Sequence, residues 1–307
     1  DMSDPSGAAE PELSPDEALR ILQDHIANFE GSPAPSAPAK GRYGTSQVPP
    51  DRTKDNGGSE ARSDSLQDEA NVPLELAPHA AKVLMKVLYE ARYARFDLLR
   101  AVCALAQQVS KWDRACDLKL CRLMCYINGS LALRMTRWMG DPSSQLCVHL
   151  FADADFTGCA KTSRSTSGMH LSLIGPNSVW PIAGQSKKQT CVSHSTPEAE
   201  IVSADHALRM HGLAALDLWS RVLQNEELVI DFHEDNSTAV QVLKSWYSAS
   251  MRHIERTHGV CLRFLAERFA SKDFNVHYER SALEAADIYT KHFVSAAEWQ
   301  LATKLIN

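Results

Sequence analysis

Hydrophobic and polar residues alternate along several stretches in the second half of the chain. Leu146, Val148 and Leu150 occupy every second position and lead to Asp153. A period of two is typical of a β-strand with one buried face. The same alternation predicts four further strands, at about 170–174, 178–183, 228–232 and 274–278. Proline cannot donate a ladder hydrogen bond, so Pro181 indicates that the strand at 178–183 is an edge strand or contains a bulge.

Upstream of these strands, apolar residues recur every three or four positions, as they do on one face of a helix. Three helices are expected within 79–140, and the third runs from about Trp112 to Ile127, before the stop signal Asn128-Gly129. None of the three carries a cluster of acidic residues or histidines. A packing role is therefore the expectation for this segment.

Capping signals mark the helices of the second half. Thr196-Pro197-Glu198 combines a cap with a first-turn proline and opens a long helix that ends near Leu223. Ser281-Ala282-Leu283-Glu284 is a capping box and opens a final helix that carries Asp287. The order of strands and helices predicts a mixed α/β fold. Two further helices are expected at about 236–246 and 253–270.

Composition divides the chain into two unlike parts. Residues 1–78 hold 10 of the 14 prolines and carry 15 acidic against 6 basic residues, a net charge of −9. That leaves 23 acidic and 26 basic residues, a net charge of +3, for 79–307. The first part is expected to be a disordered Pro/Ser/Gly-rich tail, apart from a short transient or partner-docked helix at 15–29. The mildly basic remainder is compatible with a polyanionic partner.

The chain has no stretch of about 18 apolar residues and no apolar leader, so neither a membrane span nor secretion is expected. An intracellular location, in a cytoplasmic particle or the nucleus, is expected instead. The eight cysteines are then expected to be reduced thiols. Cys116, Cys121 and Cys125 lack a C-x-x-C pair and fall on an apolar helical pattern, which favours buried thiols over a zinc site.

Four acidic residues stand out by their positions. Asp153 and Asp235 end predicted strands, where ligand sites of open α/β sheets form, and Glu200 and Asp287 lie about one turn inside predicted helices. Converging carboxylates repel one another unless divalent cations neutralise them, and oxygen ligands favour Mg²⁺ or Mn²⁺ over zinc. A pair of such ions supports phosphodiester cleavage. Spacing alone leaves open the alternative that these are four unrelated surface acids.

Seven short segments resemble, in the same order, the motifs of ribonuclease H domains from copia-type retrotransposon Pol polyproteins. FADADFTG resembles the family's SDADWAG, and EDNSTA resembles its CDNQSA. The connection segment between polymerase and ribonuclease H in these polyproteins is similar to 112–129, and the whole resemblance covers roughly 79–294. The seven segments lie at 151–158, 162–168, 180–189, 195–200, 234–239, 252–255 and 286–291.

This resemblance implies a ribonuclease H-like mixed five-stranded sheet flanked by helices, over 144–294. A helical connection segment would precede it at 79–140, and a helical tail would follow at 295–307. The family's metal-binding acids align with four residues of this chain. The implied catalytic metal ligands are Asp153, Glu200, Asp235 and Asp287.

The resemblance also implies two Mg²⁺ ions, or Mn²⁺ in their place. Asp153 would bridge both ions, Glu200 and Asp235 would hold one, and Asp287 the other. Asp155 shares the strand face of Asp153, which suggests a supporting contact. Glu198 and Glu200 are two residues apart on a helix and cannot both point into one site; the family pattern favours Glu200.

Cleavage of the RNA strand of an RNA–DNA hybrid requires contacts to phosphates and to 2′-hydroxyls across the minor groove. Asn236 is a candidate for a 2′-hydroxyl contact or for capping a helix. His253 is a candidate for a phosphate contact or for pairing with a nearby acid. The candidate nucleic-acid-binding residues are Arg164, Lys187, Lys188, Asn236, Arg252, His253 and Lys291.

The leading hypothesis is a two-metal-ion ribonuclease H from a copia-like retroelement polyprotein, with the reverse transcriptase portion of that polyprotein as a further partner. The alternative is a catalytically decayed or domesticated remnant that binds nucleic acid or protein, which the acidic tail motivates. DNA strand transfer is a third hypothesis, but Asp287 and the copia-like segments argue against it. The aromatic-x-Asp-Asp polymerase signature is absent from the sequence, so polymerisation is not expected.

Overall fold

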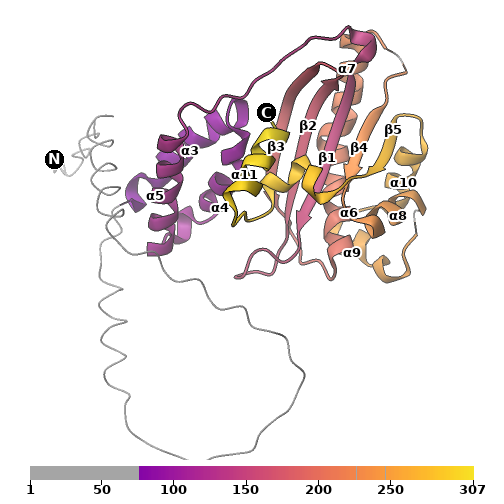
Figure 1. Cartoon of the computed structure of the whole chain (residues 1–307). Coiled ribbons are helices and arrows are strands. Elements are labelled where there is room, and N and C mark those ends of the chain that lie inside the picture. Colours follow the sequence, from indigo (N-terminus) through magenta and orange to yellow (C-terminus); the bar gives the residue numbers. More distant parts are fainter. Residues whose placement is uncertain (1–75, 226, 246) are drawn as a thin grey trace, which may run out of the picture. The chain divides into compact units, whose positions relative to one another are not determined.

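The computed structural model of the chain describes residues 76–225, 227–245 and 247–307 (Figure 1). The expected acidic tail and its short helix at 15–29 lie outside the described residues. The described residues belong to two units. One contains 76–78 and Trp112–Ser130, and the other contains His79–Lys111 and Leu131–Asn307. The domain limits expected from the sequence stay predictions.

Three helices precede the sheet, at the places where the apolar period predicts them. They are α3 (Ala77–Tyr93), α4 (Leu99–Ala106) and α5 (Arg114–Gly129). The side chain of Asp113 caps α5. All eight cysteines are free thiols. On α5, Cys116 and Cys121 are buried as expected, whereas Cys125 is only half-buried.

Five strands form one mixed sheet in the order β3-β2-β1-β4-β5. β1 pairs antiparallel with β2 and parallel with β4, while β2–β3 is antiparallel and β4–β5 parallel. The expected mixed five-stranded sheet flanked by helices is therefore confirmed. The strands are β1 (Cys147–Asp155), β2 (Thr166–Gly175), β3 (Ser178–Lys188), β4 (Ile230–Glu234) and β5 (Phe274–Tyr278).

Pro181 lies on an edge strand and also at an irregularity. β3 is an edge strand, and its register with β2 shifts where Leu171 faces Ala183 and Ser172 faces Pro181. Both β2 and β3 extend further than the alternation predicts. Most of β2 is buried on both faces, so its sequence reads as a mixed run rather than as alternating positions.

A layer of helices packs on one face of the sheet. α6 (Thr196–Ala207) contacts β1 and β2, whereas α8 (Ser237–Ser245) and α10 (Leu262–Ala270) contact β5. The N-cap of α6 is Ser195, one residue before the expected cap. The expected long helix is interrupted by a π-helical turn, Leu208–Gly212, before α7 (Leu213–Val222). The apolar period continues through such a turn and does not reveal it.

The prediction of a single helix at 253–270 is wrong, because the chain turns within this range. α9 covers only Ile254–His258, and α10 starts at Leu262. Gly259 between them has a φ of 69°, in the left-handed region that ends helices and that glycine adopts without strain.

The prediction of a final helix that starts at the 281–284 capping box is also wrong. Two 3₁₀ turns replace it, Ser281–Leu283 and η7 (Ala285–Tyr289). The Glu284 carboxylate accepts a hydrogen bond from the backbone N–H of Ala286 (3.0 Å) and so caps η7. η7 contacts β1, β2 and β3, and in Figure 1 this yellow segment lies in front of the sheet with α6 behind it. α11 (Ala296–Leu305) forms the expected C-terminal helix.

The hydrophobic core lies between the sheet and α6. Val148, Leu150 and Ile230 from the strands and Ile201 from α6 have no exposed surface. This packing fixes the ends of β1 and β4 relative to the first turns of α6. No helix in the described part of the chain is long and apolar enough to span a bilayer.

Candidate metal centre

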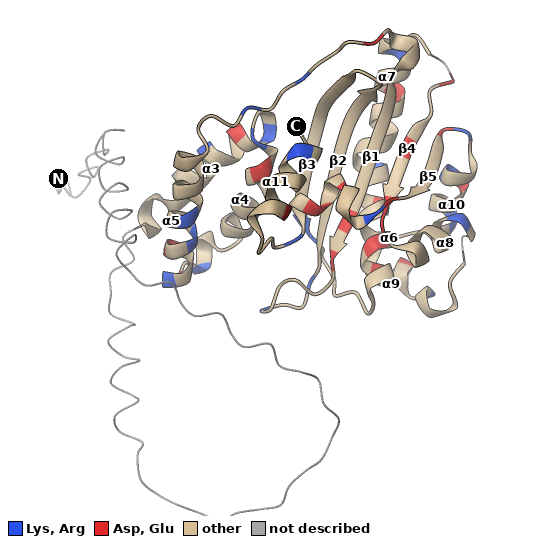
Figure 2. Ribbon diagram, in the orientation of Figure 1, with Lys and Arg blue, Asp and Glu red and all other residues tan. Residues whose placement is uncertain are grey.

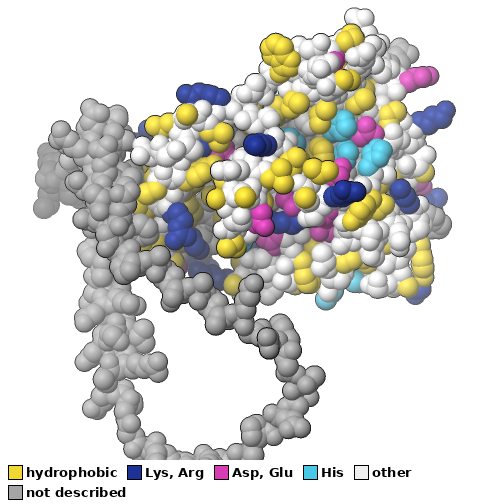
Figure 3. All heavy atoms as spheres, viewed as in Figure 1, with side chains coloured by type: hydrophobic (Ala, Val, Ile, Leu, Met, Phe, Trp, Pro, Cys, Tyr) yellow, Lys and Arg dark blue, Asp and Glu magenta, His cyan; other side chains and the backbone are white. Residues whose placement is uncertain are grey.

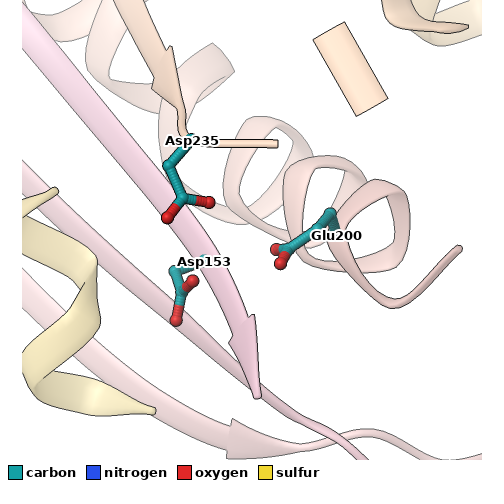
Figure 4. Close-up of side chains that lie close together, drawn as sticks. All are labelled: Asp153, Glu200 and Asp235. Atoms are coloured by element: carbon teal, nitrogen blue, oxygen red, sulfur yellow. The ribbon is translucent and has the colours of Figure 1, made fainter. Parts of the chain in front are cut away.

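Three of the four predicted carboxylates converge at one end of the sheet. One oxygen from each of Asp153, Glu200 and Asp235 lies within 4.8 Å of the others. Figure 4 shows the three side chains pointing toward one another from β1, α6 and the end of β4. Asp153 and Glu200 are buried, whereas Asp235 is half-buried. Among the residues that the structure describes, this is the one group of possible metal ligands that meets that distance limit.

Strand register and helix packing together create this convergence. The parallel register of β1 and β4, continued to their ends, places Asp153 beside Asp235. Glu200 lies in the second turn of α6, which packs on β1. The hydroxyl of Ser203 donates to the backbone oxygen of Asp153 (2.8 Å) and ties the helix to the strand. Figure 2 shows acidic residues in red where these elements meet.

Asp287 reaches the same end of the sheet from η7, with Lys291 between it and the other acids. Lys291 Nζ lies 2.6 Å from Asp287 Oδ1, 3.5 Å from Asp235 Oδ2 and 3.8 Å from Asp153 Oδ1. Asp287 is not part of the group within 4.8 Å. The structure thus brings three of the predicted acids into one group, and the ammonium group of Lys291 links Asp287 to two of them. In Figure 3 acidic and basic side chains lie side by side on this face.

Two further carboxylates are fully buried near the site. Glu234 accepts a hydrogen bond from the backbone N–H of Asn236 (3.1 Å), and Glu284 accepts the one from Ala286. Their Oε2 atoms, like that of Glu200, have no hydrogen-bond partner among the described residues. A buried oxygen without a hydrogen-bond partner is unfavourable. A cation next to these carboxylate oxygens would therefore stabilise the site.

Burial raises the pKa values of these carboxyl groups. Burial is the largest cause for Asp153, although Lys291 opposes it. Burial and then the charge of Glu234 raise the pKa of Glu200 well above its usual value. Burial, followed by the charge of Asp153, raises the pKa of Asp287 to about 7. Raised pKa values favour protonation of these carboxyl groups when no divalent cation is bound, and protonation lowers the negative charge of the cluster.

The donor set fits a hard divalent cation. Carboxylate oxygens are the ligands of Mg²⁺ and Mn²⁺, and no thiol or imidazole belongs to the group of Asp153, Glu200 and Asp235. The unpartnered Oε2 of Glu200 supplies a buried ligand atom that no described residue engages. The cluster is therefore a chemically consistent site for such an ion.

Asp155 and Glu198, the two acids with competing claims, are engaged elsewhere. Asp155 Oδ2 accepts a hydrogen bond from Arg100 Nη2 (3.3 Å). Glu198 Oε1 lies 3.1 Å from His253 Nε2, away from the three converging carboxylates. The sequence preference for Glu200 over Glu198 agrees with this geometry.

Three predicted nucleic-acid-binding residues lie at the same end of the sheet as the three converging carboxylates. Arg164 is exposed in the loop between β1 and β2, and Lys187 is exposed near the end of β3. Lys188 Nζ donates to Cys159 Sγ (2.7 Å), which lowers the pKa of that thiol to about 7. Strand pairing sets Lys188 across β2 from Asp155, about 10 Å away at two strand spacings.

The other predicted contacts have structural partners. Asn236 Oδ1 accepts a hydrogen bond from the backbone N–H of Ala239 (3.0 Å) and caps α8. His253 pairs with Glu198, which agrees with the alternative that it pairs with a nearby acid. Arg252 is exposed and donates to the Tyr247 hydroxyl (2.9 Å). Their contacts with nucleic acid stay predictions, as does that of Lys291.

Four residues of the site were not singled out from the sequence. The Thr290 hydroxyl donates to Asp153 Oδ2, and Arg100 Nε donates to the Thr290 carbonyl (2.5 Å). Thr290 and Glu234 lie inside copia-like segments, so the resemblance could have identified them as site residues. Arg100 lies on α4, where no motif in the sequence points to a role in the site. The sequence places Glu284 in a capping box with Ser281 and gives no sign of its burial near the site.

The sequence matches no protein-family model, and no curated protein matches it. Three solved structures are similar to the chain. Ribonuclease H1 from the halophilic archaeon Halobacterium salinarum is 14% identical over 45% of this chain and 89% of that one, with a TM-score of 0.32. LC11-RNase H1, isolated from compost by a metagenomic approach, is 10% identical over 47% and 92%, with a TM-score of 0.30. The PFV RNase H domain is 15% identical over 52% and 91%, with a TM-score of 0.31.

Proposed function

We propose that the chain is a divalent-ion-dependent endonuclease that hydrolyses the RNA strand of RNA–DNA hybrids. The observation that supports it most is the convergence of Asp153, Glu200 and Asp235, which are far apart in the sequence and come from three elements. The copia-like segments that contain these acids supply the reaction type and the substrate class. They also support an origin in a retroelement polyprotein, with its reverse transcriptase portion as a partner.

Each acid has a role in this proposal. Asp153, Glu200 and Asp235 would hold one Mg²⁺ or Mn²⁺ ion, and Asp153 and Asp287 a second. Such ions lower the pKa of water and stabilise a leaving oxygen. The Thr290 hydroxyl orients the Asp153 carboxylate, and the contact between α6 and β1 positions Glu200. Carboxyl groups with raised pKa values release protons as they become ligands.

Lys291 competes with a cation at the second position. Its ammonium group lies against Asp153 and Asp287, which would hold that ion, and also 3.5 Å from Asp235. Asp153 and Asp287 could hold an ion there only if the ammonium group of Lys291 moved away. The Lys291 side chain is 37% exposed, so once displaced it has room to turn toward solvent and meet a phosphate of the substrate.

The basic residues beside the site suit a nucleic acid backbone. Arg164 and Lys187 are exposed, and Lys188 is within two strands of Asp155. Phosphate contacts of this kind position the duplex without reading its sequence. Discrimination of RNA from DNA then requires a contact to a 2′-hydroxyl.

A labelled RNA–DNA hybrid incubated with the full chain and Mg²⁺ tests the proposal. We expect cleavage of the RNA strand, and a loss of at least about a hundredfold in rate for Asp235→Asn, because it removes a ligand charge. Asp217→Asn alters an exposed acid on α7 and serves as the matched control. Absence of RNA cleavage by the wild-type chain, or equal rates for wild type and Asp235→Asn, would refute the proposal.

The position of Lys291 favours one alternative, a remnant that binds hybrids without cutting them. A lysine that permanently neutralises the acids would leave the basic residues free to bind the backbone. Hybrid binding with an ordinary salt dependence, together with no cleavage at any Mg²⁺ concentration, is the outcome that this alternative predicts.

A further inference from the structure

A second group of metal-ligating side chains lies at the start of α6, apart from the three converging carboxylates. Glu198 is in the first turn of α6 and its side chain is 1% exposed. His253 precedes α9 and His258 is the last residue of α9. The Nε2 atoms of both histidines lie 3.1 Å from the same atom, Glu198 Oε1.

His258 is the residue that hydrogen bonding does not explain. Its side chain is 1% exposed, yet neither ring nitrogen makes a hydrogen bond with any residue that the structure describes. The 3.1 Å approach to Glu198 lies outside hydrogen-bond geometry. A buried polar group without a partner is unfavourable and is rare in folded proteins. Its Nε2 atom nevertheless lies 3.1 Å from the carboxylate oxygen that His253 also contacts.

The spacing and the chemistry of this group suit zinc. With bonds of about 2.0–2.1 Å, two ligand atoms of a tetrahedral Zn²⁺ lie about 3.3 Å apart, close to the 3.1 Å between each nitrogen and Glu198 Oε1. Two histidines and one glutamate are an established zinc donor set. The two Nε2 atoms must approach each other when the ion binds, because the three atoms do not all lie within 4.8 Å of one another.

The surroundings orient these ligands and leave a path for an ion. Glu198 Oε2 accepts a hydrogen bond from the backbone N–H of His194 (3.1 Å), which fixes the carboxylate. The His194 ring lies edge-on to that of His253, with centroids 5.0 Å apart, so a third imidazole lies next to the group. The His253 side chain is 36% exposed, so solvent reaches the group from that side.

We propose that Glu198, His253 and His258 form a structural zinc site that joins the first turn of α6 to α9. The imidazole ligands distinguish it from the hard-oxygen site of Asp153, Glu200 and Asp235. Zinc would bind the His258 ring, whose nitrogens make no hydrogen bond with a described residue. It also holds the helical turn that carries Glu200 two residues further on, so it supports the position of that acid without taking part in cleavage.

Calorimetric titration of the chelator-treated full chain with Zn²⁺ tests the site. Excess Mg²⁺ in the buffer occupies the oxygen site, and Asp235→Asn is titrated in parallel to identify any zinc bound there. We expect one Zn²⁺ per chain, retained in Asp235→Asn. Loss of an outer partner of a metal ligand already weakens binding 10- to 100-fold, so His253→Gln and His258→Gln should each weaken it at least about tenfold.

His79→Gln, which alters an exposed histidine on α3, is the matched control and should bind zinc as the wild type does. Zinc should also raise the thermal unfolding midpoint of the wild-type chain but not that of His253→Gln. That variant alters a partly exposed residue, so it keeps the test valid if His258→Gln fails to fold. Zinc binding that disappears in Asp235→Asn, no zinc binding at all, or wild-type affinity in His253→Gln would overturn the proposal.

Discussion

At the scale of single residues, Lys291 and a divalent cation compete for the same carboxylate oxygens. Its Nζ atom lies 2.6 to 3.8 Å from three of them. Lys291→Met removes the charge and keeps an unbranched side chain. We expect Mg²⁺ affinity to rise at least about tenfold, because unit charges about 4 Å apart interact by several kcal/mol near a protein surface. Calorimetry with Mg²⁺ measures this, with Lys187→Met as the control, and unchanged or weaker binding in Lys291→Met would contradict it.

His170 gives a pH dependence that does not involve the metal centre. Complete burial lowers its pKa to about 3, and Nδ1 contacts the Tyr289 hydroxyl (2.9 Å). The unfolded chain binds this proton near pH 6.5, so the stability contribution is complete above that pH and is lost as pH falls. The wild type should therefore lose about 1.4 kcal/mol per pH unit relative to His170→Gln between about pH 6 and pH 5.

Urea unfolding of both proteins at several pH values measures this difference. The shifts of other groups affect the two proteins alike and cancel in the comparison. A free-energy difference between wild type and His170→Gln that does not change with pH would show that His170 is not buried in its neutral form.

The sequence identified the acids of the site better than their surroundings. Asp153 lies two residues before the end of β1 and Asp235 directly follows β4, and the sequence marks both places because the apolar alternation stops before them. Lys291 was assigned to phosphate binding because nothing in the sequence shows that η7 turns it toward Asp287. The link from Arg100 to Asp155 joins residues 55 positions apart, and only the packing of α4 brings them together.

At the scale of elements, η7 and the residue after it, Thr290, pack closely against β2 at Gly168. A Cβ added at Gly168 would lie 2.7 Å from Thr290 Cγ2 and 2.8 Å from the Ala286 carbonyl oxygen. Gly168→Ala should therefore destabilise the fold by about 1–3 kcal/mol and weaken Mg²⁺ binding, because η7 carries Asp287. Chemical unfolding and calorimetry measure the two effects.

Gly129→Ala is the control for this substitution, because a Cβ there meets no atom within 4 Å. Gly129→Ala should leave Mg²⁺ binding unchanged. It should also change the free energy of unfolding by much less than Gly168→Ala does. If Gly168→Ala proves as stable as the wild type and binds Mg²⁺ equally well, then η7 does not hold Asp287 in the way described.

Regular elements were predictable because their periods are written in the sequence, and irregular ones were not. β1 and β4 followed from alternation, and α6 from its cap and proline. The π turn at Leu208–Gly212 and the 3₁₀ turns around Glu284 keep a helix-like spacing of apolar residues, so a helical period does not distinguish them. The break at Gly259 had a signal, a glycine within the expected helix, that the apolar pattern on both sides outweighed.

At the scale of the whole molecule, charge is divided unevenly along the chain. Residues 1–78 carry a net charge of −9 and 79–307 a net charge of +3. Hybrid binding therefore depends on local basic groups rather than on net charge. Replacing Lys187 and Lys188 together by Gln should lower the slope of log affinity against log salt by about 2, one for each phosphate contact.

Fluorescence anisotropy with a labelled hybrid, in the absence of divalent ions, measures that slope. The matched control replaces Lys244 and Lys272, two exposed lysines elsewhere on the same unit, by Gln. Equal slopes for the wild type and the Lys187/Lys188 double variant would exclude these residues from the nucleic-acid contact.

On the proposal made above, the fold gathers distant carboxylates into a site for divalent cations. Anomalous scattering from crystals soaked in Mn²⁺ tests it most directly. We predict an anomalous peak among the carboxylate oxygens of Asp153, Glu200 and Asp235 in the wild-type chain, and its loss in Asp235→Asn. Wild-type crystals without a peak at that position, at a Mn²⁺ concentration that supports hybrid cleavage, would contradict the account.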